Sequence, residues 1–274
     1  MPLGFPVALL CYTVRMAEPD NRRLVRERFT RTAEQFATFS LATRAAEAAH
    51  LVELAAPRGA ERAMDLACGP GTFTREFAPR VRSICGVDIT AALLAHAPAA
   101  SAKAGLPNTR FVCGDGAALP FGDGVFDLGV CAYAVHHFSA PEKCLAELTR
   151  VVRRGGRIAL VDVAIPEGSD ADAANAIERA RDASHCSTFT RAQFESLLGE
   201  RGLRLLRCEF GSRPRSFDEW MQIAGWKPGD PAYAATRRLM EQHLERDSSG
   251  FAPRRDGPDL SWIQTSLFLV AERL

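Results

Sequence analysis

The sequence lacks several features that would assign a chain to a class at once. No apolar run approaches the roughly 20 residues of a membrane-spanning helix. The 34 basic and 33 acidic residues nearly cancel, to a formal net charge of +1, so no overall field favours nucleic acid or an anionic membrane. The apolar residues 1–15 lack the basic start of a signal peptide. We therefore expect a cytoplasmic protein with no membrane span and no nucleic-acid partner.

The sequence also lacks any C-x-x-C pair, although it contains eight cysteines. Most of them sit in apolar, strand-like runs, which indicates buried reduced thiols and no metal site. Thiol chemistry on a soft substrate is the alternative, and only the number of cysteines favours it. The cysteines are Cys11, Cys68, Cys85, Cys113, Cys131, Cys144, Cys186 and Cys208.

The first part of the chain divides into a leader and a helical region. We interpret residues 1–20 as a leader or tail, with Met1 and Met16 as alternative starts. Residues 21–58 are charged and alanine-rich, with apolar residues at helical spacing, and they predict two helices that end at Pro57 and Gly59.

Short apolar runs then alternate with helical segments over residues 59–210. Such alternation predicts an α/β fold with a doubly wound, mostly parallel, seven-stranded sheet. Two capping boxes predict helix starts, Ser139 with Glu142 and Thr190 with Gln193, and the pair Gly155-Gly156 is expected to stop the first of these helices. The expected strands cover residues 63–67, 84–87, 111–113, 126–132, 158–163, 203–210 and 263–270.

Two segments, residues 166–188 and 211–260, fit the alternation poorly. Insertions of this kind above an α/β sheet usually build the substrate side of a site, although surface packing explains them equally well. Residues 211–274 are therefore expected to form a substrate-side insertion followed by the final strand of the same sheet.

A glycine-rich turn, residues 65–71 (Asp-Leu-Ala-Cys-Gly-Pro-Gly), joins the first predicted strand to a helix. Glycine lets the backbone approach a ligand closely, and the helix start offers unpaired N–H groups. A loop of this kind suits dinucleotides and S-adenosylmethionine alike. Thr74 occupies the place of the third glycine of a dinucleotide loop, and Asp65 would repel a pyrophosphate but attract an ammonium group.

Acids also end the next two predicted strands. Asp88 follows residues 84–87, where a carboxylate accepts hydrogen bonds from ribose hydroxyls, and Asp115 follows residues 111–113. Three acids at three successive strand ends, one of them beside a glycine loop, predict a nucleoside-binding site.

These motifs resemble those of the class I S-adenosylmethionine-dependent methyltransferases. The resemblance is strongest to the ubiquinone and menaquinone biosynthesis C-methyltransferases and their small-molecule relatives (the type 11 domain), and it covers roughly residues 28–210. It rests on the loop of residues 65–71, on Gly-Val-Asp at 86–88, on Gly-Asp-Gly at 114–116 with Leu-Pro-Phe at 119–121, and on Phe-Asp at 126–127 with His-His-Phe at 136–138.

The resemblance implies a Rossmann-like fold, an N-terminal helical lid at residues 21–58 and a cofactor-binding core at 59–210. It implies Asp65, Ala67, Gly69 and Gly71 near the methionine end of the cofactor and Asp88 with Ile89 at the ribose. It also implies Asp115 and Gly116 beside adenine, with Cys131 near the cofactor. Ala67 departs from the usual glycine, and Phe36 stands where many relatives have a tyrosine.

The expected reaction is methyl transfer from S-adenosylmethionine to a small molecule, at oxygen, nitrogen or carbon. Three histidines are candidates for a catalytic base: His136, favoured because it follows the apolar run 130–135, then His137 and His185. Packing or loop roles are the alternatives for each. Arg213 and Arg215 could meet an acidic substrate group or form a solvated pair.

Two other functions remain open from the sequence. A catalytically idle S-adenosylmethionine-binding regulator would keep the cofactor motifs and lack only turnover. An NAD-dependent oxidoreductase would share the fold, although Asp65 and Thr74 argue against it. The sequence does not specify an oligomeric state.

Overall fold

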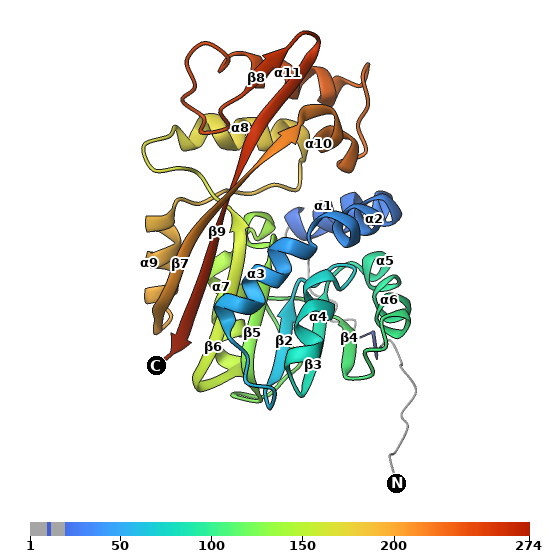
Figure 1. Ribbon diagram of the computed structural model, residues 1–274, viewed down its shortest axis with the longest axis vertical. Coiled ribbons are helices and arrows are strands. Elements are labelled where there is room, and N and C mark those ends of the chain that lie inside the picture. Colours follow the sequence, from blue (N-terminus) through green and yellow to red (C-terminus); the bar gives the residue numbers. More distant parts are fainter. Residues whose placement is uncertain (1–9, 12–19) are drawn as a thin grey trace.

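A twisted sheet runs through the molecule in the order β1-β4-β3-β2-β5-β6-β9-β7, with the short β8 paired to β9 (Figure 1). The structure is a computed structural model that describes residues 10–11 and 20–274. The expected leader, with the candidate starts Met1 and Met16, therefore lies outside the described residues except for 10–11 and 20. The strands are β1 (Leu10–Cys11), β2 (Arg62–Leu66), β3 (Ser83–Asp88), β4 (Thr109–Cys113), β5 (Phe126–Ala132), β6 (Val152–Val163), β7 (Leu203–Ser216), β8 (Arg254–Asp256) and β9 (Asp259–Arg273).

The predicted seven-stranded sheet is confirmed, with two short strands added. All pairs from β1 to β6 along the sheet are parallel, and β9 runs antiparallel between β6 and β7. The helices are α1 (Asp20–Arg31), α2 (Ala33–Thr43), α3 (Ala45–Ala55), α4 (Thr72–Phe77), α5 (Ala91–Leu94), α6 (Ala97–Lys103), α7 (Pro141–Val151), α8 (Ala171–Arg181), α9 (Arg191–Gly199), α10 (Phe217–Ile223) and α11 (Pro231–Glu241), with one-turn helices η1 (Ala78–Arg80) and η2 (Val135–His137).

Helices cover both faces of the sheet because its strands are apolar on both sides. On one face α7 and α9 bury Leu148 and Phe194 against Met64 of β2. On the other face α3 and α4 bury Leu51 and Phe77. This double layer leaves the carboxyl ends of the parallel strands as the open edge of the sheet.

Two details of the predicted helices are wrong. The region before β2 forms three helices instead of two, because the chain breaks at Thr32 and again at Arg44. Ser139 does not cap α7, whose N-cap is Ala140 without a side-chain hydrogen bond.

The predicted stop at Gly155-Gly156 is also wrong. Helix α7 ends at Val151, and β6 begins at Val152, which pairs with Phe126 of β5. A β-branched residue bonded into the sheet therefore ends the helix before either glycine is reached. The second capping box is confirmed: the Gln193 N–H donates to Thr190 Oγ1 at 3.3 Å, and the Thr190 N–H donates to Gln193 Oε1 at 2.9 Å.

The two poorly fitting segments pack together beyond the carboxyl edge of the sheet. Strands β7 and β9 extend past that edge and carry α10, α11 and β8, which lie beside α8 at the top of Figure 1. We call α8, α10, α11, β8 and the adjoining ends of β7 and β9 the upper unit. It has its own core, which includes Ile177, Phe217, Trp220, Met240 and Trp262.

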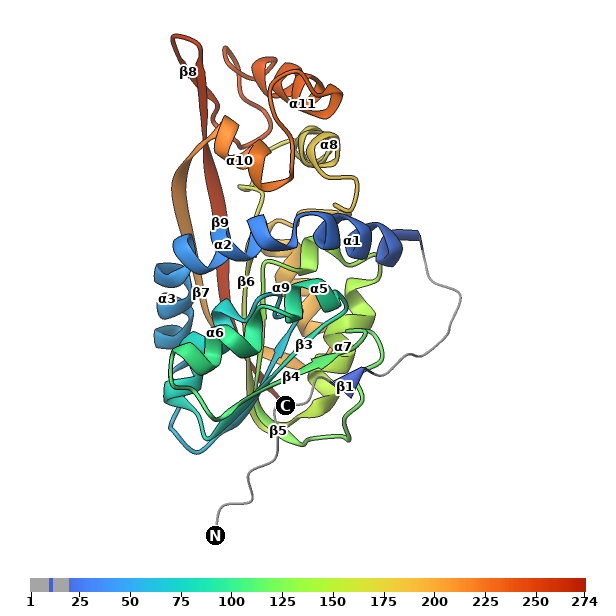
Figure 2. The ribbon, with the colours of Figure 1, turned by 90° about the vertical axis from the view of Figure 1, so that its right-hand side faces the viewer.

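Helices α1 and α2 lie between the upper unit and the sheet (Figure 2). Among the described residues, no helix combines the length and apolar character needed to cross a membrane.

Candidate active site

A large cavity opens where the strand order reverses. The chain winds outward from β2 to β3 and β4 on one side and from β5 to β6 on the other, and ligands collect at such a switch point in doubly wound sheets. The cavity has a volume of about 1080 Å³, counting the space open to solvent. Six of the predicted cofactor residues line it: Ala67, Gly69, Asp88, Ile89, Asp115 and Gly116.

The glycine-rich turn places left-handed backbone beside this cavity. Ala67, Gly69 and Gly71 all have positive φ, of 55°, 55° and 80°. Ala67 is thus in a conformation that glycine adopts more readily. Gly71 does not line the cavity, and a Cβ on it would lie 3.2 Å from Ala97 and Phe111, so its role is packing behind the turn.

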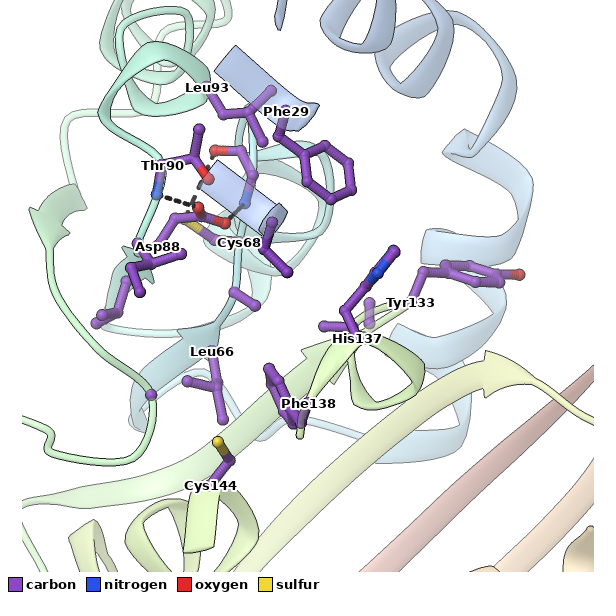
Figure 3. A pocket seen from close by; sticks show the side chains of 18 of the residues that line it. Phe29, Leu66, Cys68, Asp88, Thr90, Leu93, Tyr133, His137, Phe138 and Cys144 are labelled. Carbon is purple, nitrogen blue, oxygen red and sulfur yellow. Dashed lines mark hydrogen bonds between the residues drawn. The ribbon is translucent and has the colours of Figure 1, made fainter. Parts of the chain in front are cut away.

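Asp88 connects the turn to the end of β3. Its Oδ2 accepts a hydrogen bond from the Gly69 N–H at 2.8 Å, and its Oδ1 accepts one from the Thr90 N–H at 2.7 Å (Figure 3). Burial raises the pKa of Asp88, and these two donors oppose that shift. The carboxylate borders the cavity, as the sequence predicts.

Asp65 lies behind the turn instead of in the cavity wall. It is 1% exposed, and Thr74 Oγ1 donates to its Oδ2 at 2.6 Å. Burial raises the pKa of Asp65 to about 7, with the Thr74 hydrogen bond opposing the shift. Thr74, which replaces the third glycine of a dinucleotide loop, therefore holds this acid. Cys131 is likewise buried and does not line the cavity, whereas its neighbour Ala132 does.

The helices before β2 close over the same cavity. Arg22 Nη1 lies 2.5 Å from Asp115 Oδ2, and Ser40 Oγ lies 2.9 Å from Thr72 Oγ1. The first contact joins α1 to the loop after β4, and the second joins α2 to the start of α4. Both helices are thereby fastened to the cofactor side of the fold.

A second cavity of about 560 Å³ adjoins the first. Its walls come from α1 and α2, from the ends of β5 and β6, and from the upper unit. Five residues line both cavities and are called the junction here: Phe29, Phe36, Arg44, Tyr133 and His137. Phe39 lines the second cavity but not the first.

His136 lines the second cavity and not the first. Its Nδ1 lies 2.5 Å from Oδ1 of Asp162, a residue of β6 that is 1% exposed. Burial lowers the pKa of His136, but the negative charge of Asp162 outweighs burial and raises the pKa above its usual value. Asp162 was not predicted as a site residue, because it lies within an apolar strand and only the fold brings it to His136.

His137 belongs to the junction, and its pKa is shifted in the opposite direction to that of His136. Its Nδ1 lies 3.1 Å from the Ser184 carbonyl oxygen, and its ring packs edge-on against Phe29. Burial, with the charge of His136, lowers the pKa of His137 to about 3, so its imidazole is neutral at neutral pH.

His185 lines neither cavity and is 4% exposed, so it is not a surface loop residue either. Its ring lies 5.7 Å from that of His136, and its Nε2 lies 2.8 Å from Asn175 Oδ1. Burial lowers the pKa of His185 to about 2. Its position supports the loop behind His136.

Tyr133 is a junction residue that sequence reasoning missed. It has a φ of 52°, which is rare for a bulky residue and typical of functional sites. The Arg44 guanidinium lies 3.5 Å from its ring centroid, and its hydroxyl lies 3.1 Å from Ser266 Oγ. The available signal was a lone tyrosine between an apolar strand and the pair His136-His137.

Comparisons with known proteins agree with this geometry. Residues 64–160 match the sequence model of a family described as "Methyltransferase domain". The chain is similar to YcgJ of Bacillus subtilis, an uncharacterized methyltransferase, with 29% identity over 88% of this chain and 96% of the relative. The chain is an S-adenosylmethionine-dependent methyltransferase.

Two further relatives extend the comparison of this methyltransferase with known proteins. A Bacillus halodurans protein provisionally described as a methyltransferase superposes with a TM-score of 0.75 at 26% identity, over 83% of this chain and 99% of that one. Demethylmenaquinone methyltransferase of Thermus thermophilus is 36% identical over 42% of this chain and 53% of that protein. The predicted family is confirmed, and the oxidoreductase alternative is wrong.

Proposed function

We propose that this methyltransferase binds S-adenosylmethionine in the larger cavity and methylates a small molecule held in the second cavity. The observation that carries the proposal is the junction, whose five side chains border both spaces. A cofactor in one cavity and an acceptor in the other would therefore meet there. When bound, S-adenosylmethionine supplies an electrophilic methyl group.

The residues of the larger cavity fit this cofactor. Each Asp88 carboxylate oxygen accepts one backbone N–H and keeps a lone pair for a ribose hydroxyl. Gly69 has no side chain, and a Cβ placed on it would come no closer than 3.9 Å to Phe36 and Leu93. The space beside the turn is therefore open to a ligand. Asp115 and Gly116 would border adenine.

His136 is placed to remove a proton from the acceptor. Because its Nδ1–H donates to the Asp162 carboxylate, Nε2 is left as the basic nitrogen. This arrangement favours a hydroxyl or amine acceptor, which must lose a proton when it is methylated, over a carbon acceptor that is already ionised. Asp162 acts as the positioning residue that fixes the tautomer.

We also propose a role in this reaction for each part of the chain. Residues 21–58 form the lid, 59–210 form the cofactor-binding core, and 211–274 form the insertion with the final strand. The insertion contributes Trp220, Ile223 and Trp262 to the wall of the second cavity. This wall is the physical reason for expecting the acceptor there.

Calorimetry with the purified full chain tests the cofactor assignment. S-adenosylmethionine and S-adenosylhomocysteine should bind, and NAD should not. Binding of NAD without binding of adenosylmethionine would end the proposal. An idle binding module would bind the cofactor equally well and is separated from the enzyme only by turnover.

A further inference from the structure

Arginines are concentrated around the second cavity. Four of them line it, and they come from α1, from the break between α2 and α3, from α8 and from β7. Arg213, also on β7, does not line it. The lining arginines are Arg28, Arg44, Arg181 and Arg215. Among the residues that the structure describes, two carboxylates line the same cavity, those of Glu178 and Asp182.

Two of the four arginines have carboxylate partners within the cavity wall. Arg28 Nε lies 2.7 Å from Asp182 Oδ2, and Arg181 Nη1 lies 3.6 Å from Glu178 Oε2. These two ion pairs use both carboxylates of the cavity wall. The positive charges of Arg44 and Arg215 therefore have no carboxylate partner within that wall.

The other arginines are under-paired. Arg44 and Arg213 share one acid outside the cavity, Glu47, at 3.4 and 3.5 Å. Within the described part of the chain, the buried Nε of Arg44 and Nη2 of Arg213 meet no hydrogen-bond acceptor. A buried cation without a full set of partners is costly, so a cluster of this kind indicates a missing anion.

Arg215 is the extreme case. It is 7% exposed, and among the described residues it forms no ion pair with a carboxylate. Its hydrogen bond goes from Nη1 to the neutral Gln264 Oε1 at 2.8 Å, and its guanidinium lies 5.2 Å from the Phe39 ring centroid. Burial and the neighbouring arginines lower the pKa of Arg215 to about 9, which still leaves it charged at neutral pH.

We infer that the methyl acceptor carries an oxyanion, a carboxylate or a phosphate, that pairs with Arg215 in the second cavity. This inference rests on the proposed function and names the class of its acceptor. A planar guanidinium matches both oxyanions with two parallel hydrogen bonds. Phe29, Phe36, Phe39, Trp220 and Trp262 line the same cavity and suit an apolar or aromatic body. The acceptor is therefore amphipathic, with its anionic end on Arg215 and its reacting end at the junction.

Three matched probes test the inference on the full chain saturated with S-adenosylhomocysteine: phenylacetate, phenyl phosphate and neutral phenylacetamide. At least one anion should bind about 10–100-fold more tightly than the amide, the range expected for losing hydrogen bonds between charged groups. Which anion binds distinguishes a carboxylate from a phosphate. Equal binding of all three probes, or binding of neither anion, would overturn the inference.

Two variants with the same substitution identify the responsible residue. Arg215→Gln should abolish the preference for the anion. Arg207→Gln, on the same strand but exposed and outside both cavities, should keep it. A preference that persists in Arg215→Gln would contradict the assignment.

Thermal unfolding of these variants without ligand separates binding from folding. An under-paired buried cation destabilises the fold, so Arg215→Gln should unfold at the same temperature as the parent or higher. A large drop would instead make Arg215 a structural residue bonded to Gln264. Arg215→Lys then keeps the charge, and it should restore part of the anion preference.

The inference and the proposed function fail in different ways. If S-adenosylhomocysteine forms with neutral acceptors but not with anionic ones, the methyltransferase reaction is supported and the anion site is overturned. Tight anion binding dependent on Arg215, with no turnover of any acceptor, would support the site and count against the reaction.

Discussion

Asp88 serves two parts of the site with one carboxylate. It accepts the N–H groups of Gly69 and Thr90, and it borders the cofactor cavity. Removing it would therefore affect cofactor affinity and the shape of the turn together. Thr74 does not border the cavity and acts only behind the turn, where its hydroxyl donates to Asp65.

Asp88→Ala should weaken S-adenosylmethionine binding about 10–100-fold, because hydrogen bonds to a charged group are lost. It should also lower the free energy of unfolding by about 1–3 kcal/mol, since two buried N–H groups lose their acceptor. Calorimetry and urea unfolding measure the two effects. Asp123→Ala, at an exposed acid outside the cavity, is the control. Unchanged affinity in Asp88→Ala would mean that the ribose is held elsewhere.

His136 gives the reaction a defined pH dependence. A base must be neutral to accept a proton, and Asp162 raises the pKa of His136 above 6.5. Turnover should therefore rise with pH, with a midpoint above 6.5, and Asp162→Asn should move that midpoint downward. The contribution of the His136–Asp162 pair to the free energy of unfolding changes with pH in the opposite direction to turnover. It is complete below pH 6.5 and is lost as the pH rises through the folded-state pKa of His136.

The pH profile of turnover in the parent and in Asp162→Asn checks this account. His136→Ala should reduce turnover at least about 100-fold while leaving cofactor affinity nearly unchanged. A decrease of only a few-fold, or a midpoint that Asp162→Asn does not move, would make His136 a packing residue.

At the scale of single helices, two similar capping motifs have different outcomes. Thr190 and Gln193 cap α9 reciprocally, whereas Ser139 makes no capping bond to α7. Thr190→Ala should therefore cost about 0.5–2 kcal/mol of unfolding free energy, and Ser139→Ala should cost less than about 0.5 kcal/mol. Urea unfolding of both variants measures this, and equal losses would contradict the assigned caps.

The lid helices are attached at both ends of the site. Arg22 of α1 pairs with Asp115 beside the cofactor cavity, and Arg28 pairs with Asp182 beside the second cavity. We expect residues 24–39 to act as a mobile lid that orders over the bound cofactor. Amide hydrogen exchange in this segment should slow when S-adenosylhomocysteine is added. High protection before any ligand is added would identify a fixed structural hairpin.

Helices and strands whose ends are marked by a local sequence pattern could be predicted. Those whose ends depend on contacts with residues far away in the chain could not. Strand ends with Asp88 and Asp115 were found because apolar runs and acids stand side by side in the sequence. The helix end at Val151 was missed because pairing of Val152 with Phe126, a residue far away in the chain, decides it. The break at Arg44 was also missed, and Arg44 lies between the two helices with its guanidinium 3.5 Å from the Tyr133 ring centroid.

For the whole molecule, the cofactor side could be predicted and the acceptor side could not. The cofactor cavity depends on a continuous motif with fixed spacing around the turn of residues 65–71. The second cavity is lined by Arg28, His136, Arg181 and Arg215, which come from four separate elements, and no local pattern connects them. Upper-unit packing around Trp220 brings them together.

The central claim is methyl transfer across the junction, and formation of S-adenosylhomocysteine tests it most directly. The full chain and its His136→Ala variant would be incubated with S-adenosylmethionine and a protein-free extract of small metabolites, with an extract-free sample as blank. The account predicts extract-dependent formation of S-adenosylhomocysteine by the parent and at least about 100-fold less by the variant. Tight cofactor binding without any extract-dependent product would contradict it and identify an idle binding module.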